Sequence, residues 1–193
     1  MCTRYYTDGG VYPESVKAEV AQGLAHVEQV TGKQFGNTAD PLLVSVRSGA
    51  RISMPGMMDT VLNLGLNDAT VEGLAATSGD ERFAWDSYRR FIQMYSDVVL
   101  ELDHGAFEEA LDIAKEDRGY DLDTEMTAAD WKILVAEYKA IVEKLWNKPF
   151  PQDVNDQLWG AIGAVFGSWQ SDRAKVYRRL NSIPGEWLSL IHI

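Results

Sequence analysis

The centre of this 193-residue chain contains two short apolar runs, Pro41-Leu42-Leu43-Val44-Ser45-Val46 and Thr60-Val61-Leu62-Asn63-Leu64. The segment between them, residues 47–59, contains glycine and proline. Short apolar runs bounded by such residues are typical of buried strands. The sequence therefore predicts a strand, a loop and a second strand within residues 41–64.

The flanking regions show helical periodicity. Residues Pro13 to Thr31 place Val16, Val20, Leu24 and Val27 at spacings of three and four, with Gly32 as a stop. From about residue 69 to residue 181 the pattern is helical, and Thr127 with Asp130 resembles a capping box. We expect an α+β fold dominated by helix, with helices over 13–31, 81–100, 106–115, from 127 to the prolines at 149 and 151, and over 153–169.

Composition excludes several classes of protein. The 18 basic and 29 acidic residues give a net charge of −11, which argues against a broad nucleic-acid surface. The apolar fraction of 46% is too high for a disordered acidic tail. The only cysteine, Cys2, cannot form an intrachain disulfide, and the chain has no apolar run long enough for a membrane span. We therefore expect a cytoplasmic protein of one or two domains, with no membrane partner.

The loop after the first strand carries the chemistry. If the chain stays extended, its period of two puts Arg47, Gly49 and Arg51 on one face, where two guanidinium groups could grip an oxyanion. Gly56 would let backbone N–H groups approach a phosphate. Met54, Met57 and Met58 suit a loop that closes and excludes water.

A simpler interpretation of the same residues stays open. Arginines at strand ends commonly pair with surface carboxylates, and methionine-rich loops often only cover a core. The glycine pattern is neither the Walker motif nor the dinucleotide fingerprint. Spacing alone therefore leaves both a phosphate site and a purely structural loop possible.

Longer strings add a family resemblance. The run from Leu42 to Asp68 contains Val-Arg-Ser-Gly-Ala-Arg, Ser-Met-Pro-Gly-Met-Met-Asp-Thr and Leu-Asn-Leu-Gly-Leu-Asn-Asp. Together with later motifs, it resembles the nucleotide-binding domain of the pyruvate, phosphate dikinase family. The water dikinases share the Val-Arg-Ser start but diverge within Met-Pro-Gly-Met-Met. The later motifs are Arg82-Phe83-Ala84, residues 86–94, Pro149-Phe150-Pro151-Gln152, residues 164–166, Ser168-Trp169, Arg173-Ala174 and Tyr177-Arg178-Arg179.

The resemblance implies a function and a set of site residues. Members transfer phosphoryl groups among ATP, phosphate and pyruvate, giving AMP, pyrophosphate and phosphoenolpyruvate, with Mg²⁺ accompanying ATP. Their nucleotide domain resembles an ATP-grasp fold, and the parent enzyme is expected to be a homo-oligomer. The residues implied in ATP and phosphate binding are Arg47, Arg51, Gly56, Met58 and Asp59, with Arg47 the firmest match.

The resemblance also predicts a division of the chain. Residues 1–66 and 153–187 would form part of an ATP-grasp-like subdomain, and residues 67–152 a helical insertion. Residues 188–193, Leu-Ser-Leu-Ile-His-Ile, match the translation of a transposon end used in sequencing libraries and are predicted to be non-native.

The same resemblance predicts an internal fragment. The phosphocarrier histidine and its Thr-Ser-His context are absent, so no catalytic residue is assigned, and His26, His104 and His192 are interpreted as bystanders. The resemblance places the family's magnesium carboxylates outside this sequence, so no metal ligand is assigned. We expect the chain alone not to complete the dikinase reaction. Two alternatives remain: the nucleotide domain of a related phosphoenolpyruvate synthase or water dikinase, and a non-catalytic helical interaction module.

The other arginines and the tryptophans have structural interpretations. Arg89-Arg90 and Arg178-Arg179 could line a nucleotide cleft or form ion pairs with neighbours such as Asp86. Ion pairing is favoured for Arg89-Arg90. For Arg178-Arg179 the two interpretations are equally supported. Acidic clusters such as Glu108-Glu109 are expected on solvated faces. The tryptophans are assigned to the core and to subdomain contacts; they are Trp85, Trp131, Trp146, Trp159, Trp169 and Trp187.

Overall fold

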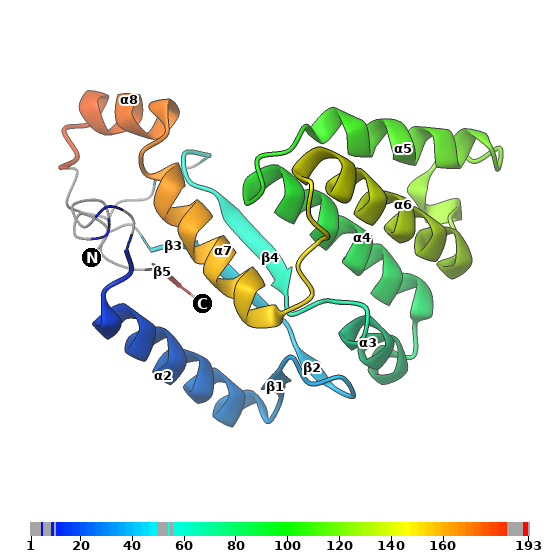
Figure 1. The fold of residues 1–193 in the computed structure, drawn as a ribbon, viewed down its shortest axis with the longest axis horizontal. Helices are drawn as coiled ribbons and strands as arrows, with labels where there is room; N and C mark the ends of the chain where they lie inside the picture. The colour runs from blue at the N-terminus through cyan, green and yellow to red at the C-terminus, as the bar shows by residue number, and fades with distance from the viewer. Residues whose placement is uncertain are drawn as a thin grey trace.

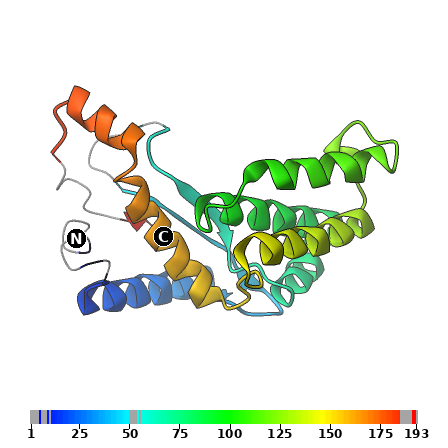
Figure 2. The ribbon, with the colours of Figure 1, turned by 45° about the horizontal axis from the view of Figure 1, so that its top comes forward.

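The computed structural model describes residues 5, 9, 11–49, 54, 56–184, 191 and 192. Figure 1 shows a small sheet in the middle of the molecule, with α2, α7 and α8 on one side and the helices α3 to α6 on the other. Seen from a second direction, these two groups of helices remain separate (Figure 2). The fold is mostly helical with small sheets, as predicted from the sequence.

The central sheet is built around one hairpin. Strand β3 (Val44–Ser48) pairs antiparallel with β4 (Thr60–Leu64) and with the two-residue β5 (Ile191–His192), giving the order β4-β3-β5. Two further short strands, β1 (Gln34–Phe35) and β2 (Pro41–Leu42), pair in parallel. The second predicted strand is confirmed. The first is divided at Leu43 and extends to Ser48.

A bulge interrupts the hairpin and explains one unusual backbone conformation. Val44 lies opposite Leu64, whereas Val46 lies opposite Val61, so β4 holds one more residue than β3 across this interval. Asn63 takes up the extra length with a φ of 57°. Asparagine tolerates this left-handed region better than most residues. The bulge leaves Val44, Val46, Val61 and Leu64 buried on one face.

Three helices lie on one side of the central sheet (Figure 1). Helix α2 (Glu14–Thr31) follows Pro13 and ends at Gly32 with a φ of 70°, as the sequence predicts. Helix α7 (Val154–Ser168) packs on both hairpin strands, and Asp153 caps it by accepting from the N–H groups of Asn155 and Asp156. The short α8 (Asp172–Leu180) follows after a tight connection.

The other helices gather around α4 (Glu81–Val98), which contacts α3 (Thr70–Ser78), α6 (Ala128–Trp146), α5 (His104–Glu116) and β4. A 3₁₀ turn, η1 (Asp123–Glu125), precedes α6. The predicted capping box is present: Thr127 accepts from the Asp130 N–H at 3.3 Å, and Asp130 accepts from the Thr127 N–H at 2.9 Å. Local sequence therefore determines where α6 begins.

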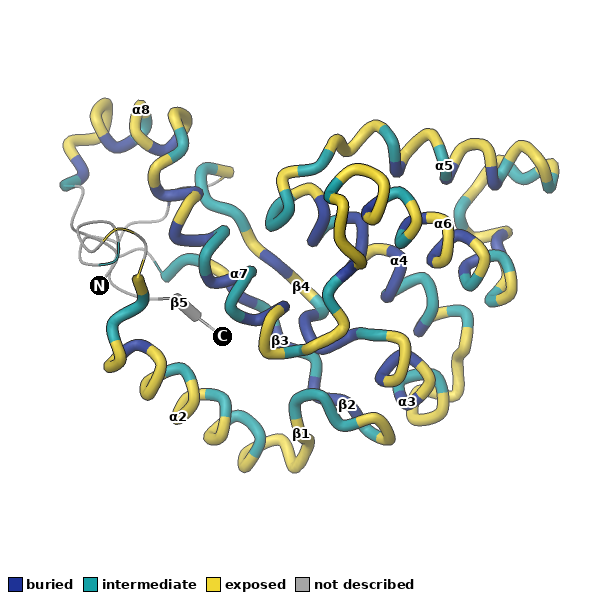
Figure 3. Tube along the Cα trace, in the orientation of Figure 1, coloured by how far each residue is buried: buried dark blue, intermediate teal, exposed yellow. Residues whose placement is uncertain are grey.

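One continuous hydrophobic core joins the sheet to the helices. Figure 3 shows buried segments along α4, on α6 and in the hairpin, while α2 is mainly exposed or intermediate. Of the tryptophans, Trp131 and Trp169 are fully buried, and Trp85, Trp146 and Trp159 pack against the core. Trp187 lies outside the described residues. The assignment of these indoles to the core is confirmed for the five that can be seen.

Gln157, which is fully buried on α7, holds two connecting segments together. One leads from β4 to α3, and the other leads from α6 back to α7. The side-chain oxygen of Gln157 accepts from the Gly65 N–H at 3.3 Å, and its amide nitrogen donates to the Leu66 and Pro151 carbonyls, each at 2.9 Å. One glutamine therefore joins the outgoing chain at 65–66 to the returning chain at 151.

A second set of contacts surrounds the same point. Gln152 accepts from the Asp68 N–H at 3.0 Å and donates to the Tyr88 hydroxyl at 3.2 Å, while Tyr88 and Lys139 donate to the Asp68 carboxylate. Burial is the main reason that the pKa of Tyr88 lies above the ordinary tyrosine value. The phenol therefore stays protonated and serves as a donor.

No helix in the described part of the chain has the length and apolar character needed to cross a membrane.

Candidate functional site

Arg47 lies near the free end of the β3–β4 hairpin. It is the fourth residue of β3 and pairs with Thr60 of β4 on one side and with His192 on the other. Val44 and Val46 point into the core, so the alternation of the strand leaves Arg47 exposed on the opposite face. The prediction that this arginine emerges from an apolar strand is confirmed, although the strand runs one residue further.

The guanidinium of Arg47 has no ion pair and no side-chain hydrogen bond to any residue that the structure describes. This distinguishes it from Arg82, Arg89, Arg118 and Arg173, which all bind carbonyls or carboxylates. The expectation of pairing with surface carboxylates is therefore not met at Arg47 within the described residues. Arg51, predicted as its companion, lies outside them.

The second half of the connecting loop folds into a tight turn. The Met57 N–H donates to the Met54 carbonyl at 3.1 Å, and Gly56 inside this turn has a φ of 71°. A side chain at position 56 would be strained in that conformation, so glycine is favoured there. No heavy atom of the described residues outside the immediate neighbours lies within 4 Å of where a Gly56 Cβ would stand, which leaves space beside the backbone.

The methionines of the loop belong to the packing of the molecule. Met54 is buried in the core, and Met57 and Met58 are half-buried against it. This agrees with the simpler interpretation, in which such a loop covers the core. Closure over a ligand remains a prediction.

Asp59 ends the loop and is anchored to α7 and α8. Its backbone N–H donates to the Ser168 hydroxyl at 3.2 Å, and its carboxylate forms an ion pair with Arg173. Sequence reasoning did not assign roles to Ser168 and Arg173, although both occur in quoted motifs. Each stands more than 100 residues from its partner, so no local spacing could have indicated these contacts.

A cavity of about 530 Å³ borders this anchored end of the loop. Asp59 and Ser168 line it, together with Glu101 and the small residues of α7, among them Gly160 and Gly163. A second cavity, of about 350 Å³, lies between β4 and α4 and is lined in part by Leu62, Arg90 and His104. One hollow of the surface therefore includes the end of the loop, and the other includes residues of β4.

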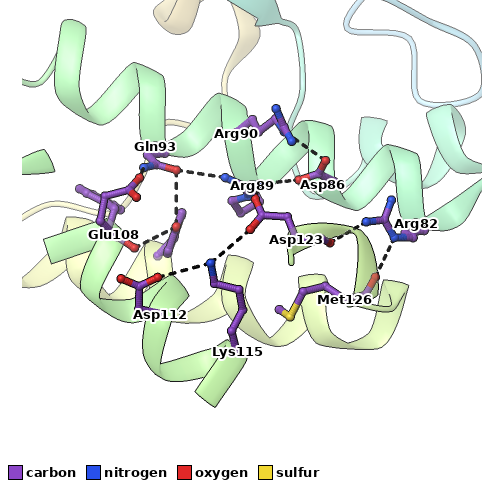
Figure 4. A network of polar contacts seen from close by, with 12 residues as sticks. Arg82, Asp86, Arg89, Arg90, Gln93, Glu108, Asp112, Lys115, Asp123 and Met126 are labelled. Carbon is purple, nitrogen blue, oxygen red and sulfur yellow. Dashed lines mark hydrogen bonds and ion pairs between the residues drawn. The ribbon is translucent and has the colours of Figure 1, made fainter. Parts of the chain in front are cut away.

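The two consecutive arginines of α4 have different environments. Arg90 is exposed and donates to Asp86 at 3.1 Å, which confirms the predicted surface pairing. Arg89 also binds Asp86, at 2.7 Å, but its side chain is only 6% exposed and lies over the Trp131 ring at 4.7 Å. The expectation of a surface position is wrong for Arg89 because Asp123 and Gln93 complete a buried polar site around it (Figure 4).

Other candidates have structural surroundings. Arg178 is buried and lies over the Trp169 ring, whereas Arg179 is exposed. His26 is exposed on α2, and His104 lies between Asp97 and Glu108 at 3.7 and 3.4 Å. Glu108 and Glu109 are exposed, as expected of a solvated face, and Glu108 also accepts from the Gln93 amide.

An exposed arginine that has no acidic partner among the described residues, on the strand that leads into a loop with a glycine turn, is suited to binding an anion. Comparison with known families agrees with this class of site. Residues 10–191 match the family model described as "Pyruvate phosphate dikinase, AMP/ATP-binding domain". The chain belongs to this family.

The most informative relatives are themselves pyruvate, phosphate dikinases. The chain is 53% identical to the enzyme of Rhizobium meliloti over 192 residues and 52% identical to that of Clostridium symbiosum over 193 residues, in both cases over 100% of the chain. It is 51% identical to pyruvate, phosphate dikinase 2 of Zea mays over 95% of its length. These alignments cover 21%, 22% and 21% of the relatives, so the chain spans about a fifth of their length.

Proposed function

We propose that this chain binds ATP and supplies part of the nucleotide site of a pyruvate, phosphate dikinase. That enzyme would convert ATP, phosphate and pyruvate into AMP, pyrophosphate and phosphoenolpyruvate. The observation that supports the proposal is the exposed guanidinium of Arg47, which has no acidic partner among the described residues. Family membership supplies the identity of the anion as a nucleotide phosphate.

Within this proposal the site residues have distinct parts. Arg47 binds phosphate oxygens, because its fork matches two oxygens and its charge stays fixed at neutral pH. Gly56 gives the phosphate chain access to backbone N–H groups, and Met58 packs the loop against the core. Arg51 is the proposed second cation. These residues contribute positioning and positive charge, which are the main requirements of phosphoryl transfer.

Mg²⁺ is proposed as a companion of ATP. Asp59 is the only carboxylate of the described loop residues, and it is already paired with Arg173. Among the described residues, no group of three or more histidine, cysteine, aspartate or glutamate side chains could hold a metal ion. The described residues therefore offer no ready-made cluster of three such ligands, and in this proposal the ion would be held mainly by the phosphate oxygens of the nucleotide.

The proposal includes an ATP-grasp-like arrangement in two subdomains. Residues 1–66 and 153–187 would hold the nucleotide, and residues 67–152 would form the helical insertion. The contacts of Gln157, Gln152 and Asp68 support this division, since both chain crossings meet there. For residues 188–193 we keep the proposal of a non-native tail, although β5 pairs with β3.

The proposal is tested by Arg47→Ala in the full 193-residue chain. Isothermal titration with Mg·ATP should show binding by the unaltered protein and a loss of about 10- to 100-fold in the variant, as expected for a hydrogen-bonded charge. Because Arg47 is exposed, the melting temperature should not change. Arg90→Ala, which removes an exposed arginine that is already paired with Asp86, is the control and should bind normally.

Two results would contradict the proposal. Mg·ATP binding that is equally strong in the unaltered chain and in Arg47→Ala would remove Arg47 from the site. No binding by the unaltered chain, under conditions where circular dichroism shows it to be folded, would contradict the assignment of nucleotide binding to this chain.

A further inference from the structure

Arg173 joins α8 to the end of the loop that follows Arg47 in sequence. Its Nε donates to the Met57 carbonyl at 3.3 Å, and its terminal nitrogen forms the ion pair with the Asp59 carboxylate. The two loop residues flank Met58, so one planar guanidinium contacts the loop on both sides of that position. A lysine would hold the carboxylate as a point charge without the same fixed fork.

Ser168 fixes the same residue from the end of α7. Its hydroxyl accepts from the Asp59 N–H at 3.2 Å and donates to the Val165 carbonyl of its own helix at 2.8 Å. The Met58 sulfur lies 3.7 Å from the same oxygen. Residues 57–59 are thus held by the last residue of α7 and the second residue of α8.

These contacts bear on the position of Arg47. Thr60 follows Asp59 directly and is the β4 partner of Arg47 in the hairpin. Anchoring Asp59 therefore fixes where the loop enters the strand that pairs with Arg47. The tight turn at Gly56 lies only three residues earlier, so the same anchor limits the movement of its backbone N–H groups.

The ion pair between Arg173 and Asp59 also changes the net charge of the loop. The Asp59 side chain is 28% exposed and lies in the loop that is proposed to approach phosphates, where an uncompensated carboxylate would repel them. The Arg173 guanidinium offsets that charge. A half-exposed ion pair contributes little to global stability, so its effect should be local.

We propose that Arg173 is a positioning residue that holds residues 56–59 in place and neutralises Asp59 beside the nucleotide phosphates. The role given to the loop in nucleotide binding rests on the proposed function. The contacts by which Arg173 and Ser168 hold the loop do not. It also assigns Asp59 to anchoring the loop, in place of direct contact with phosphate.

The test compares Arg173→Met with Lys175→Met in the full chain. The control is closely matched, because both side chains lie on α8, both are 52% exposed and both changes remove one positive charge. Hydrogen exchange followed by mass spectrometry should show faster exchange in Arg173→Met only for peptides covering residues 56–60, by about tenfold. Lys175→Met should match the unaltered chain.

Mg·ATP titration gives the functional measurement. Arg173→Met should weaken binding by about tenfold with an unchanged melting temperature, and Arg173→Lys should recover part of the loss because it keeps the charge opposite Asp59. Asp59→Asn serves as a second variant that removes the ion pair but keeps the N–H bond to Ser168. It should also accelerate exchange at 56–60.

The outcomes separate this inference from the proposed function. Unchanged exchange at 56–60 in both Arg173→Met and Asp59→Asn would overturn the anchor, whatever the nucleotide affinity. Accelerated exchange with unchanged Mg·ATP affinity would overturn the positioning role. If the unaltered chain binds no nucleotide, the proposed function fails, and the positioning role fails with it, while the exchange experiment still decides the anchor.

Discussion

The helices α3 to α6 and the hairpin with α7 and α8 use arginine in opposite ways. In the helical region, Arg89 is buried between Asp86, Asp123 and the Trp131 ring, and its charge is compensated inside the protein. In the hairpin region, Arg47 is exposed and has no acidic partner among the described residues. Removing the buried Arg89 would leave its carboxylate partners uncompensated, whereas the charge of Arg47 is available to a ligand.

The two regions also differ in the contacts that hold them together. The helical region has ion pairs that join α4 and α5 to the η1 turn, across 34 residues for Arg89 and Asp123 and across 8 residues for Lys115 and Asp123 (Figure 4). The hairpin loop depends on single contacts between residues more than 100 positions apart. We therefore expect substitutions in the first region to affect unfolding, and substitutions in the second to affect ligand affinity.

The largest effect on stability is expected from Arg89→Met. It would leave the Asp86 and Asp123 carboxylates in a partly buried site without their cation, at a cost of about 3 kcal/mol in the free energy of unfolding. Urea unfolding followed by circular dichroism measures this.

Arg90→Met is the matched control, because Arg90 shares the Asp86 carboxylate but is 61% exposed. It should cost less than about 1 kcal/mol. Equal losses for the two neighbouring arginines would break the distinction between the buried and the exposed kind.

An intermediate effect is expected where the two regions join. Gln157→Leu would leave the Gly65 N–H and the Leu66 carbonyl without their partner in a buried place, and should destabilise the chain by about 2 kcal/mol. The exposed Gln152, in the same crossing, provides the control Gln152→Leu, with an expected loss of about 1 kcal/mol or less. Thermal unfolding monitored by two probes checks both. A Gln157→Leu protein as stable as Gln152→Leu would show that the crossing does not depend on this buried amide.

Much of the fold could be predicted because its determinants are local. The strand at 60–64 and the end of α2 at Gly32 follow from short patterns of apolar residues and glycine. The start of α6 follows from Thr127 and Asp130, which lie three residues apart. The same holds for Arg90, whose partner is four residues away.

The remainder depends on residues that only the fold brings together. The burial of Arg89 requires Asp123, which is 34 residues away, and the anchoring of the loop requires Arg173, which is 114 residues from Asp59. No periodicity encodes such distances. In the candidate site, the exposed position of Arg47 could be predicted from strand alternation, whereas the engagement of the Asp59 carboxylate could not.

The smallest expected effect is a pH-dependent loss of stability at Asp130, a charged residue of the helical region. Burial of the Asp130 carboxyl opposes its ionisation, but hydrogen bonds from Thr127 and the guanidinium of Arg118 outweigh this and lower its pKa below the ordinary value of 3.8. A carboxyl with a lowered pKa in the folded state stabilises the protein above its unfolded pKa. That stabilisation is lost as the pH falls through the folded-state value.

Asp130→Asn, which keeps an oxygen to accept from the Thr127 N–H, should therefore cost about 1 kcal/mol at pH 6 and progressively less below pH 3.8. The measurement is urea unfolding of both proteins between pH 6 and about pH 2.5. Asp112→Asn, in which the replaced side chain is 70% exposed, is the control and should show a small difference at every pH. A difference for Asp130→Asn that stays constant down to the lowest pH would mean that packing at this position stabilises the helical region and that the ionised carboxylate does not.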